Sequence, residues 1–429
     1  MHISAQPDRL FLNLEKRSLI LFKLVPLLVL LFAITSQTAQ AQAFSVIYSF
    51  SGGTDGSGPN AGLTLDQQGN LYGTTLFGGF KGSFQCVSGC GTVFQLSLHG
   101  SDWSFTPIYA FKGRPDGANP LSTVTFGSDG SLYGATGYGG AQNCAPDGCG
   151  TVYKLTPDSH GNWTESVLYR FIGDGVDPDQ SPVTFDNQGD IYLTTRDGGS
   201  SDKGAVIELT PGPQGWTATV LFSFTNEQPN GWYPRSGVIL DAAGNLYGTA
   251  PEATPNVYEL TPSSNGWIHS ILYQFQDRGD GTLPIGGLIF DPSGNLLGTT
   301  AGDGNPFSPG GGGGVFELTP SGGGWAFRAL HDFTNSRMPF AGPWAALTRD
   351  SRGNLYGTTV WAGKYGQGSI FELTPSGSGW TFTTLHDFTS GEDGGVPFST
   401  VTIDAEGNLY GTASEGGRYG AGVVWEITP

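Results

Sequence analysis

The sequence is poor in charge and in the residue types that build helices. Of its 429 residues only 13% are charged, and 19 Lys and Arg stand against 37 Asp and Glu. A helical or coiled-coil protein would be rich in Ala, Leu, Glu and Lys, so this class is excluded. The net charge of −18 argues against nucleic acid as a partner, because it would repel a polyanion.

Long hydrophobic runs are also scarce. One run extends from Leu24 to Ile34, about half of the roughly 20 residues that a membrane-spanning helix needs. Basic residues precede it, and an Ala-Gln-Ala pattern ending at Ala43 follows. This order predicts a signal peptide over residues 1–41 and a secreted or periplasmic protein without a membrane span. The alternative is an uncleaved N-terminal anchor.

Glycine, with 70 residues, and aromatic residues, at 12%, are abundant, as in proteins of short strands and tight turns. A segment related to Asn-Leu-Tyr-Gly-Thr-Thr recurs at intervals of roughly 50 to 60 residues, a period typical of propellers and solenoids. Its seven copies begin at Asn70, Ser131, Asp190, Asn245, Asn295, Asn354 and Asn408.

Each copy predicts four strands. An apolar triplet and a turn, such as Leu63 to Gly69, precede the copy and form a hairpin with it. A third strand follows, for example Val93 to Leu96, and a fourth extends from a Trp to a Phe eight residues later, for example Trp103 to Phe111. We expect that Trp, the aromatic residue six positions on and the final Phe share one face of the strand.

The strands predict an all-β, seven-bladed β-propeller with four antiparallel strands per blade. The chain ends at Pro429 before a seventh Trp strand, but Ala43 to Phe50 match that strand. We therefore expect the N-terminal strand to complete the last blade and residues 42–429 to form a single domain. We also expect a monomer.

The repeat resembles the bacterial GloVer tandem-repeat family over residues 43–429. The resemblance rests on the Asp-Gly-x-x-Pro loop (Asp55 to Pro59), the Gly-Asn-Leu-Tyr-Gly-Thr hairpin and the Val-Phe-Glu-Leu-Thr-Pro strand. It implies an exported protein, in a family whose members carry differing C-terminal anchors. No sorting tail follows Pro429, which favours a secreted or periplasmic product. Leu193 and Leu297 depart from the motif, so we expect distorted blades there.

No catalytic constellation is evident. The histidines form no metal or nucleophile spacing, and His331 and His386 occupy a slot that holds Tyr in other repeats. Among the expected innermost strands only Arg349 is ionisable, so no acid–base pair can be assembled and no cofactor is expected. This favours a non-catalytic protein.

Two residue groups could hold a metal or a cross-link. Three aspartates crowd one loop and are kept as a calcium alternative: Asp174, Asp177 and Asp179. In an oxidising compartment the four cysteines predict two local disulfides, Cys86 to Cys90 and Cys144 to Cys149. The alternative is one zinc site with four cysteine ligands.

Loops of differing length predict a ligand-binding face. It carries the aromatic residues Phe77, Phe80, Tyr138, Trp232, Tyr233, Trp344, Trp361, Tyr365 and Tyr419. Aromatic rings on a rigid scaffold can stack on sugars or anchor a protein, although they can also pack beneath their own loops. The first hypothesis is a scaffold that recognises glycan or protein. The alternative is a propeller lyase or hydrolase acting on polysaccharide or lactone substrates.

Overall fold

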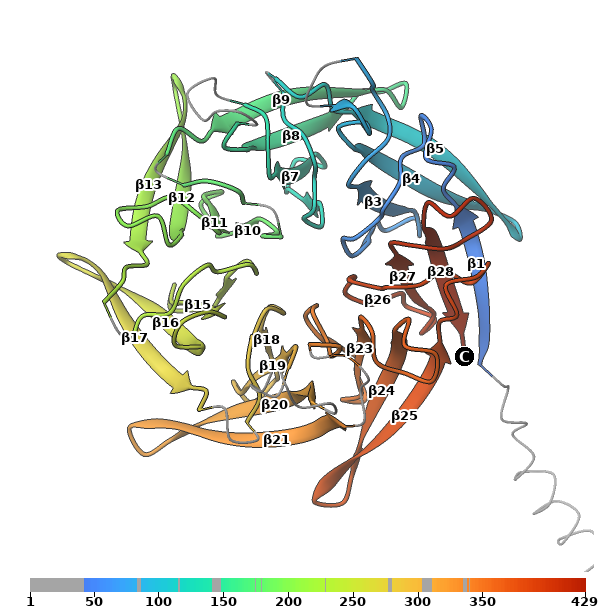
Figure 1. The fold of residues 1–429 in the computed structure, drawn as a ribbon. Helices are drawn as coiled ribbons and strands as arrows, with labels where there is room; N and C mark the ends of the chain where they lie inside the picture. The colour runs from blue at the N-terminus through green and yellow to red at the C-terminus, as the bar shows by residue number, and fades with distance from the viewer. Residues whose placement is uncertain are drawn as a thin grey trace, which may run out of the picture. The chain divides into compact units, whose positions relative to one another are not determined.

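Each repeat folds into one blade of four antiparallel strands, and seven blades form a ring (Figure 1). The blades belong to one compact unit, Phe44–Thr428. The computed structural model describes residues 42–82, 86–114, 116–140, 148–173, 175–178, 180–227, 229–276, 280–302, 311–334, 338 and 340–429. No helix among these residues is long and apolar enough to cross a membrane.

The innermost strand of every blade has two residues. These strands are β2 (Thr64–Leu65), β6 (Thr125–Phe126), β10 (Thr184–Phe185), β14 (Ile239–Leu240), β18 (Ile289–Phe290), β22 (Thr348–Arg349) and β26 (Thr402–Ile403). The second strands are buried along their whole length, because neighbouring blades cover both of their faces. They are β3 (Leu71–Thr75), β7 (Leu132–Thr136), β11 (Ile191–Thr195), β15 (Leu246–Ala250), β19 (Leu296–Thr300), β23 (Leu355–Thr359) and β27 (Leu409–Ala413).

The third and outermost strands form long hairpins at the rim of the ring. The third strands are β4 (Thr92–His99), β8 (Thr151–Pro157), β12 (Ala205–Gly212), β16 (Asn256–Ser263), β20 (Gly311–Ser321), β24 (Ser369–Ser376) and β28 (Val423–Thr428). The outermost are β5 (Asp102–Ala110), β9 (Trp163–Arg170), β13 (Gly215–Ser223), β17 (Gly266–Gln274), β21 (Gly324–Thr334), β25 (Gly379–Asp387) and β1 (Ala43–Ser49).

The predicted ring closure is confirmed. Strand β1 pairs with β28, so the last sheet has the order β1-β28-β27-β26 (Figure 1). Two threonines of this blade also bind the first blade: Thr402 Oγ1 donates to the carbonyl of Leu63 at 2.6 Å, and Thr412 Oγ1 donates to that of Ala61 at 3.0 Å. Hydrogen bonds of the same kind join other neighbouring blades, for example Thr184 Oγ1 to the Val238 carbonyl at 2.6 Å.

The predicted side-chain pattern of the outermost strand is wrong. Where β4 pairs with β5, Phe94 lies opposite Pro107 but Val93 lies opposite Tyr109, so a β-bulge shifts the register by one residue. The bulge puts Trp103 and Tyr109 on opposite faces of the sheet. Trp103 accordingly packs in the core shared with the preceding blade, and Tyr109 in the core shared with the following one. The same shift occurs in β9, β13, β17, β21 and β25.

The third blade keeps all four strands despite Leu193, which replaces the glycine of the motif. Elsewhere this glycine faces a large aromatic ring. Gly73 lies opposite Phe94, and a Cβ atom there would lie 2.6 Å from the ring. Leu193 instead lies opposite Ile207, a smaller side chain. The two changes compensate in volume, so the blade is repacked and not distorted as predicted.

The hairpin aspartates serve the turns. Asp66 accepts hydrogen bonds from the backbone amides of Gln68 and Asn70 at 2.9 Å each, and from the Tyr72 hydroxyl at 3.0 Å. The aspartate of the Asp-Gly loop pairs with the aromatic slot of the outermost strand. Tyr109 binds Asp116 at 2.6 Å and His386 binds Asp393 at 3.1 Å, so His386 replaces Tyr as a hydrogen-bonding partner.

Candidate functional site

The connection from one blade to the next lies beside the loop between second and third strands. Short antiparallel bridges join the two loop sets in six blades: Ser57 to Phe77, Ala118 to Tyr138, Val176 to Asp197, Trp232 to Glu252, Thr282 to Gly302 and Gly395 to Glu415. The connections between blades and the loops between second and third strands therefore lie on the same face of the ring. Their pairing gives this face a defined backbone.

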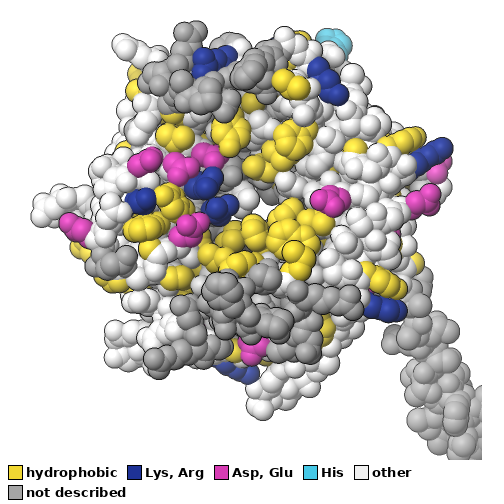
Figure 2. Space-filling model, viewed as in Figure 1, with side chains coloured by type: hydrophobic (Ala, Val, Ile, Leu, Met, Phe, Trp, Pro, Cys, Tyr) yellow, Lys and Arg dark blue, Asp and Glu magenta, His cyan; other side chains and the backbone are white. Residues whose placement is uncertain are grey.

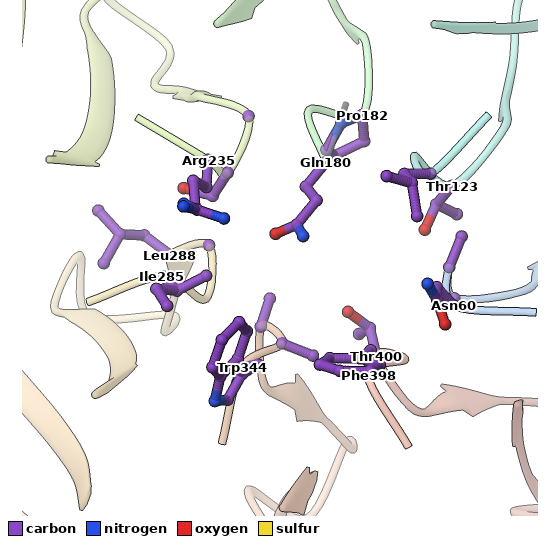
Figure 3. A pocket seen from close by; sticks show the side chains of 18 of the residues that line it. Asn60, Thr123, Gln180, Pro182, Arg235, Ile285, Leu288, Trp344, Phe398 and Thr400 are labelled. Carbon is purple, nitrogen blue, oxygen red and sulfur yellow. The ribbon is translucent and has the colours of Figure 1, made fainter. Parts of the chain in front are cut away.

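A pocket of about 340 Å³ lies where the seven connections meet (Figure 3). Every blade contributes to its wall, and six blades do so in part through the residue that follows the loop proline. The side chains at this position are Asn60, Leu121, Arg235, Ile285, Trp344 and Phe398, and Gln180 takes the corresponding place in the third blade. The volume is at the lower end of the 300–1,000 Å³ usual for small-molecule sites.

The connections are held firmly just beside the pocket. The loop proline packs against a glycine of the preceding blade: a Cβ atom on Gly91, which has a φ of +89°, would lie 2.6 Å from Cδ of Pro120. The second residue after this proline, such as Ser122 or Ser399, is buried. The Ser399 carbonyl accepts a hydrogen bond from Thr358 of the preceding blade at 2.9 Å. Pocket side chains are thus carried by a rigid frame.

The pocket has a polar arc and an apolar wall. Figure 3 shows Arg235, Gln180, Thr123 and Asn60 along one side, with the Gln180 amide pointing into the pocket. Asn60 Oδ1 is buried without a hydrogen-bond partner among the described residues. The opposite wall is formed by the apolar side chains of Ile285, Leu288, Trp344 and Phe398.

Three aromatic rings form an edge-to-face cluster at the apolar wall. The Trp344 ring centroid lies 5.6 Å from that of Phe398 and 5.8 Å from that of Trp361. The Trp344 indole nitrogen donates to the Phe340 carbonyl at 2.9 Å, which fixes the ring. Trp344 is therefore a preorganised surface on which a ligand ring could stack.

Charged side chains gather on one side of the pocket. Figure 2 shows them beside the apolar centre of this face, over the blades of β10–β13 and β14–β17. Arg235 Nη2 lies 3.6 Å from Glu252 Oε1. Burial raises the pKa of Asp197, opposed by the nearby charges of Arg196 and Arg235. These groups form a charge-balanced edge next to the polar arc.

The other predicted aromatic residues do not line the pocket. Trp232 and Tyr233 are half-buried beside Lys203, whose Nζ lies 2.7 Å from the Tyr233 hydroxyl and 4.6 Å from the Trp232 ring centroid. Trp361 contacts the pocket only through Trp344 and Phe398. The remaining five rings are exposed and do not line the pocket: Phe77, Phe80, Tyr138, Tyr365 and Tyr419.

Of the predicted calcium loop, Asp174 and Asp179 lie outside the described residues. Asp177 is buried, and its carboxylate lies 3.5 Å from the Arg196 guanidinium. The predicted disulfide between Cys86 and Cys90 is present. Cys149 is buried, and Cys144 lies outside the described residues, so the second predicted disulfide stays a prediction.

Sequence reasoning missed most of the pocket, including Asn60, Thr123, Gln180, Arg235, Ile285, Phe398 and Thr400. Most of the pocket side chains stand just before the innermost strands, and only Thr184 and Ile239 of the described lining residues belong to those strands. A usable signal was nevertheless present. The residue after the loop proline changes from repeat to repeat in size and charge, while the residue after it stays small: Ala61, Ser122, Ser236, Gly286, Ala345 and Ser399.

Fold and pocket define a seven-bladed propeller with a pocket where its seven connections meet. The chain belongs to the Gloeobacter/Verrucomicrobia repeat family, whose model matches residues 30–177, 142–339 and 253–429. The predicted GloVer membership is thereby confirmed. No curated protein matches this sequence.

Solved structures share the fold at low identity. An ancestral GH74 enzyme has a TM-score of 0.53 and 10% identity over 86% of this chain and 48% of its own. Proteins proposed to be 6-phosphogluconolactonases are similar too. The one from Bacteroides uniformis has a TM-score of 0.48 and 15% identity over 77% of this chain and 87% of its own. The one from Bacteroides fragilis has a TM-score of 0.47 and 13% identity over 82% of this chain and 88% of its own.

Proposed function

We propose that this protein is a non-catalytic binding module that holds one sugar ring, at the end of a glycan, in the axial pocket. The observation that carries the proposal is the pairing of a fixed aromatic wall, Trp344 and Phe398, with the facing arc of amides and hydroxyls. A sugar ring has an apolar C–H face and a hydroxyl edge, and this pocket offers a complementary surface to each.

The size and rigidity of the pocket favour a glycan end over a protein ligand. A protein would bury about 800 Å² of this face and would rest on the surrounding loops. The pocket instead offers convergent side chains from all seven blades around about 340 Å³. A protein that binds this face without entering the pocket would contradict the proposal.

The lining also favours binding over catalysis. Among the described residues, those that line the pocket include no carboxylate, His, Cys or Lys. A lyase or hydrolase would need an acid and a base within reach of the substrate. The carboxylates of Glu252 and Asp197 flank Arg235 outside the lining. Release of reducing sugar, or opening of a lactone, by the purified protein would favour the enzymatic alternative.

Replacing Trp344 by Ala tests the proposal. The variant should lose about five- to thirtyfold in affinity for glycans that the wild type selects on a glycan array, since one stacking ring contributes about 1–2 kcal/mol. Isothermal titration calorimetry measures the change. Trp232→Ala is the matched control, because Trp232 lies on the same loop set but not in the pocket. Equal losses in both variants would contradict an axial site.

We further propose that the protein acts outside the cytoplasm after removal of residues 1–41. The N-terminal pattern supports this, as does the Cys86–Cys90 disulfide, since such cross-links persist in oxidising compartments. N-terminal sequencing of the protein recovered from the periplasm and the medium tests it. An intact Met1 in a cytoplasmic fraction would overturn it.

A further inference from the structure

Among the described residues that line the pocket, Arg235 is the one with an ionisable side chain. Its guanidinium lies between the pocket and a group of carboxylates. Glu252 Oε1 lies 3.6 Å from Arg235 Nη2, and Asp197 is close enough to interact with both charges. The Arg235 side chain is 22% exposed and that of Glu252 is 37% exposed, so solvent screens the pair in part.

The positive charge of Arg235 is therefore already balanced by the protein. A guanidinium carries five N–H donors, and a single pairing with Glu252 leaves donors for a ligand. An oxygen of an uncharged group can accept hydrogen bonds from these donors without adding a negative charge beside Glu252 and Asp197. A ligand carboxylate would instead meet Glu252 and Asp197 across the same cation, and the net charge of −18 adds to this repulsion.

The remaining polar side chains suit hydroxyl groups. The Gln180 amide offers donors and an acceptor, the Asn60 amide offers donors, and Thr123 and Thr400 each offer a hydroxyl that can donate and accept. Sugar hydroxyls can donate and accept in turn, whereas a carboxylate can only accept. The arc thus favours the same kind of ligand as the balanced charge.

We infer that the Arg235–Glu252 pair makes the pocket selective for uncharged sugars over their acidic counterparts. Arg235 is the specificity-determining residue and donates to a neutral oxygen of the bound ring. Glu252 positions Arg235 and excludes a competing carboxylate by like charge. This inference rests on the proposed sugar-binding function and deepens it.

Matched pairs of sugars test the selectivity. Methyl glucoside is compared with methyl glucuronide and methyl galactoside with methyl galacturonide, by calorimetry on the full-length protein. Each pair differs in one group, a hydroxymethyl against a carboxylate. The wild type should bind the neutral member about tenfold more tightly. Tighter binding of the uronides would overturn the inference and leave the sugar-binding proposal intact.

Two variants assign the effect to the pair. Glu252→Gln removes the carboxylate that pairs with Arg235 and leaves only Asp197 to offset its charge, so it should raise affinity for the uronide about tenfold relative to its neutral partner. Glu406→Gln is the control, because Glu406 is exposed in the β26–β27 turn and the charge change is identical. Arg235→Gln should weaken binding of the neutral sugar about tenfold or more. Thermal melting establishes that each variant is folded.

The outcomes are distinct. An unchanged ratio in Glu252→Gln would overturn the role of the pair, even if sugars bind. Absence of binding by all four glycosides and by the wider array would overturn the sugar-binding function itself, and the selectivity with it.

Discussion

At the scale of single residues, the repeats separate what the fold requires from what a ligand could use. The loop proline and the small residue two positions later recur because the blades pack against them. The residue between them faces the axis and is free to vary, as Arg235, Ile285 and Trp344 show in successive blades. The residue that follows the loop proline in successive repeats therefore gives the candidate site much of its variation in size and charge.

Glu165 occupies a position at which most repeats carry an aromatic ring. In most blades an aromatic ring at this position stacks on the preceding blade, as Phe105 does on Tyr48 with centroids 4.5 Å apart. Glu165 is half-buried near Asp116, itself buried and bound to Tyr109. Burial, and then the charge of Asp116, raise the Glu165 pKa to about 7, while Arg170 and Lys112 oppose the shift.

This shift predicts a pH-dependent contribution to stability. Because the Glu165 pKa is higher in the folded state, folding takes up a proton between about pH 4.5 and 7, and stability falls as the pH rises through that range. Glu165→Gln removes this loss. Its melting temperature minus that of the wild type should therefore increase from pH 5 to pH 8 and then level off. A difference independent of pH would refute the assignment.

At the scale of elements, the strand assignments were predictable and their faces were not. The constant eight-residue offset from Trp to Phe located the outermost strands correctly. It did not reveal the bulge, because a strand with one extra residue can have the same offset as a regular one. The bulge lets one strand serve two cores, with Trp103 packed toward one neighbour and Phe111 toward the other.

The paired volumes of the second and third strands give a prediction. Leu193→Gly should destabilise the protein by about 3–5 kcal/mol, because it leaves a cavity against Ile207 in a buried strand. Ile207→Phe alone should also destabilise, through overpacking against Leu193. The double variant recreates the pairing of Gly73 with Phe94 and should recover at least about 1 kcal/mol relative to additive losses. Chemical denaturation measures all three, and strict additivity would contradict the compensation.

At the scale of the whole molecule, the number of repeats and of strands in the sequence was sufficient to predict the architecture. Seven copies of one motif and six Trp strands predicted both the number of blades and the strand that completes the last one. The pocket could not be predicted in the same way, because its walls converge from connections that lie up to about 340 residues apart, from Asn60 to Thr400. Only closure of the ring brings these side chains together.

Deleting residues 42–50 should therefore destabilise the whole ring. The deletion removes β1, exposes the edge of β28 and uncovers the aromatic packing of Phe44 on His386, whose centroids lie 3.7 Å apart. Differential scanning calorimetry should show a melting temperature lower by about 10 °C or more, and size-exclusion chromatography should show association. Deletion of residues 1–41 alone is the control. Equal melting temperatures would refute closure by β1.

Closure by β1 also sets an order for folding. Strand β1, which the ribosome makes before all the other strands of the ring, pairs with β28, so the final sheet cannot form until β28 has been synthesised. The hairpins within each blade involve short sequence separations and can form quickly. Pairing β1 with β28 involves the largest sequence separation of any strand pair in the ring, so it is expected to be slower. We therefore expect ring closure to be the slowest folding step, and the pocket to become able to bind only after it.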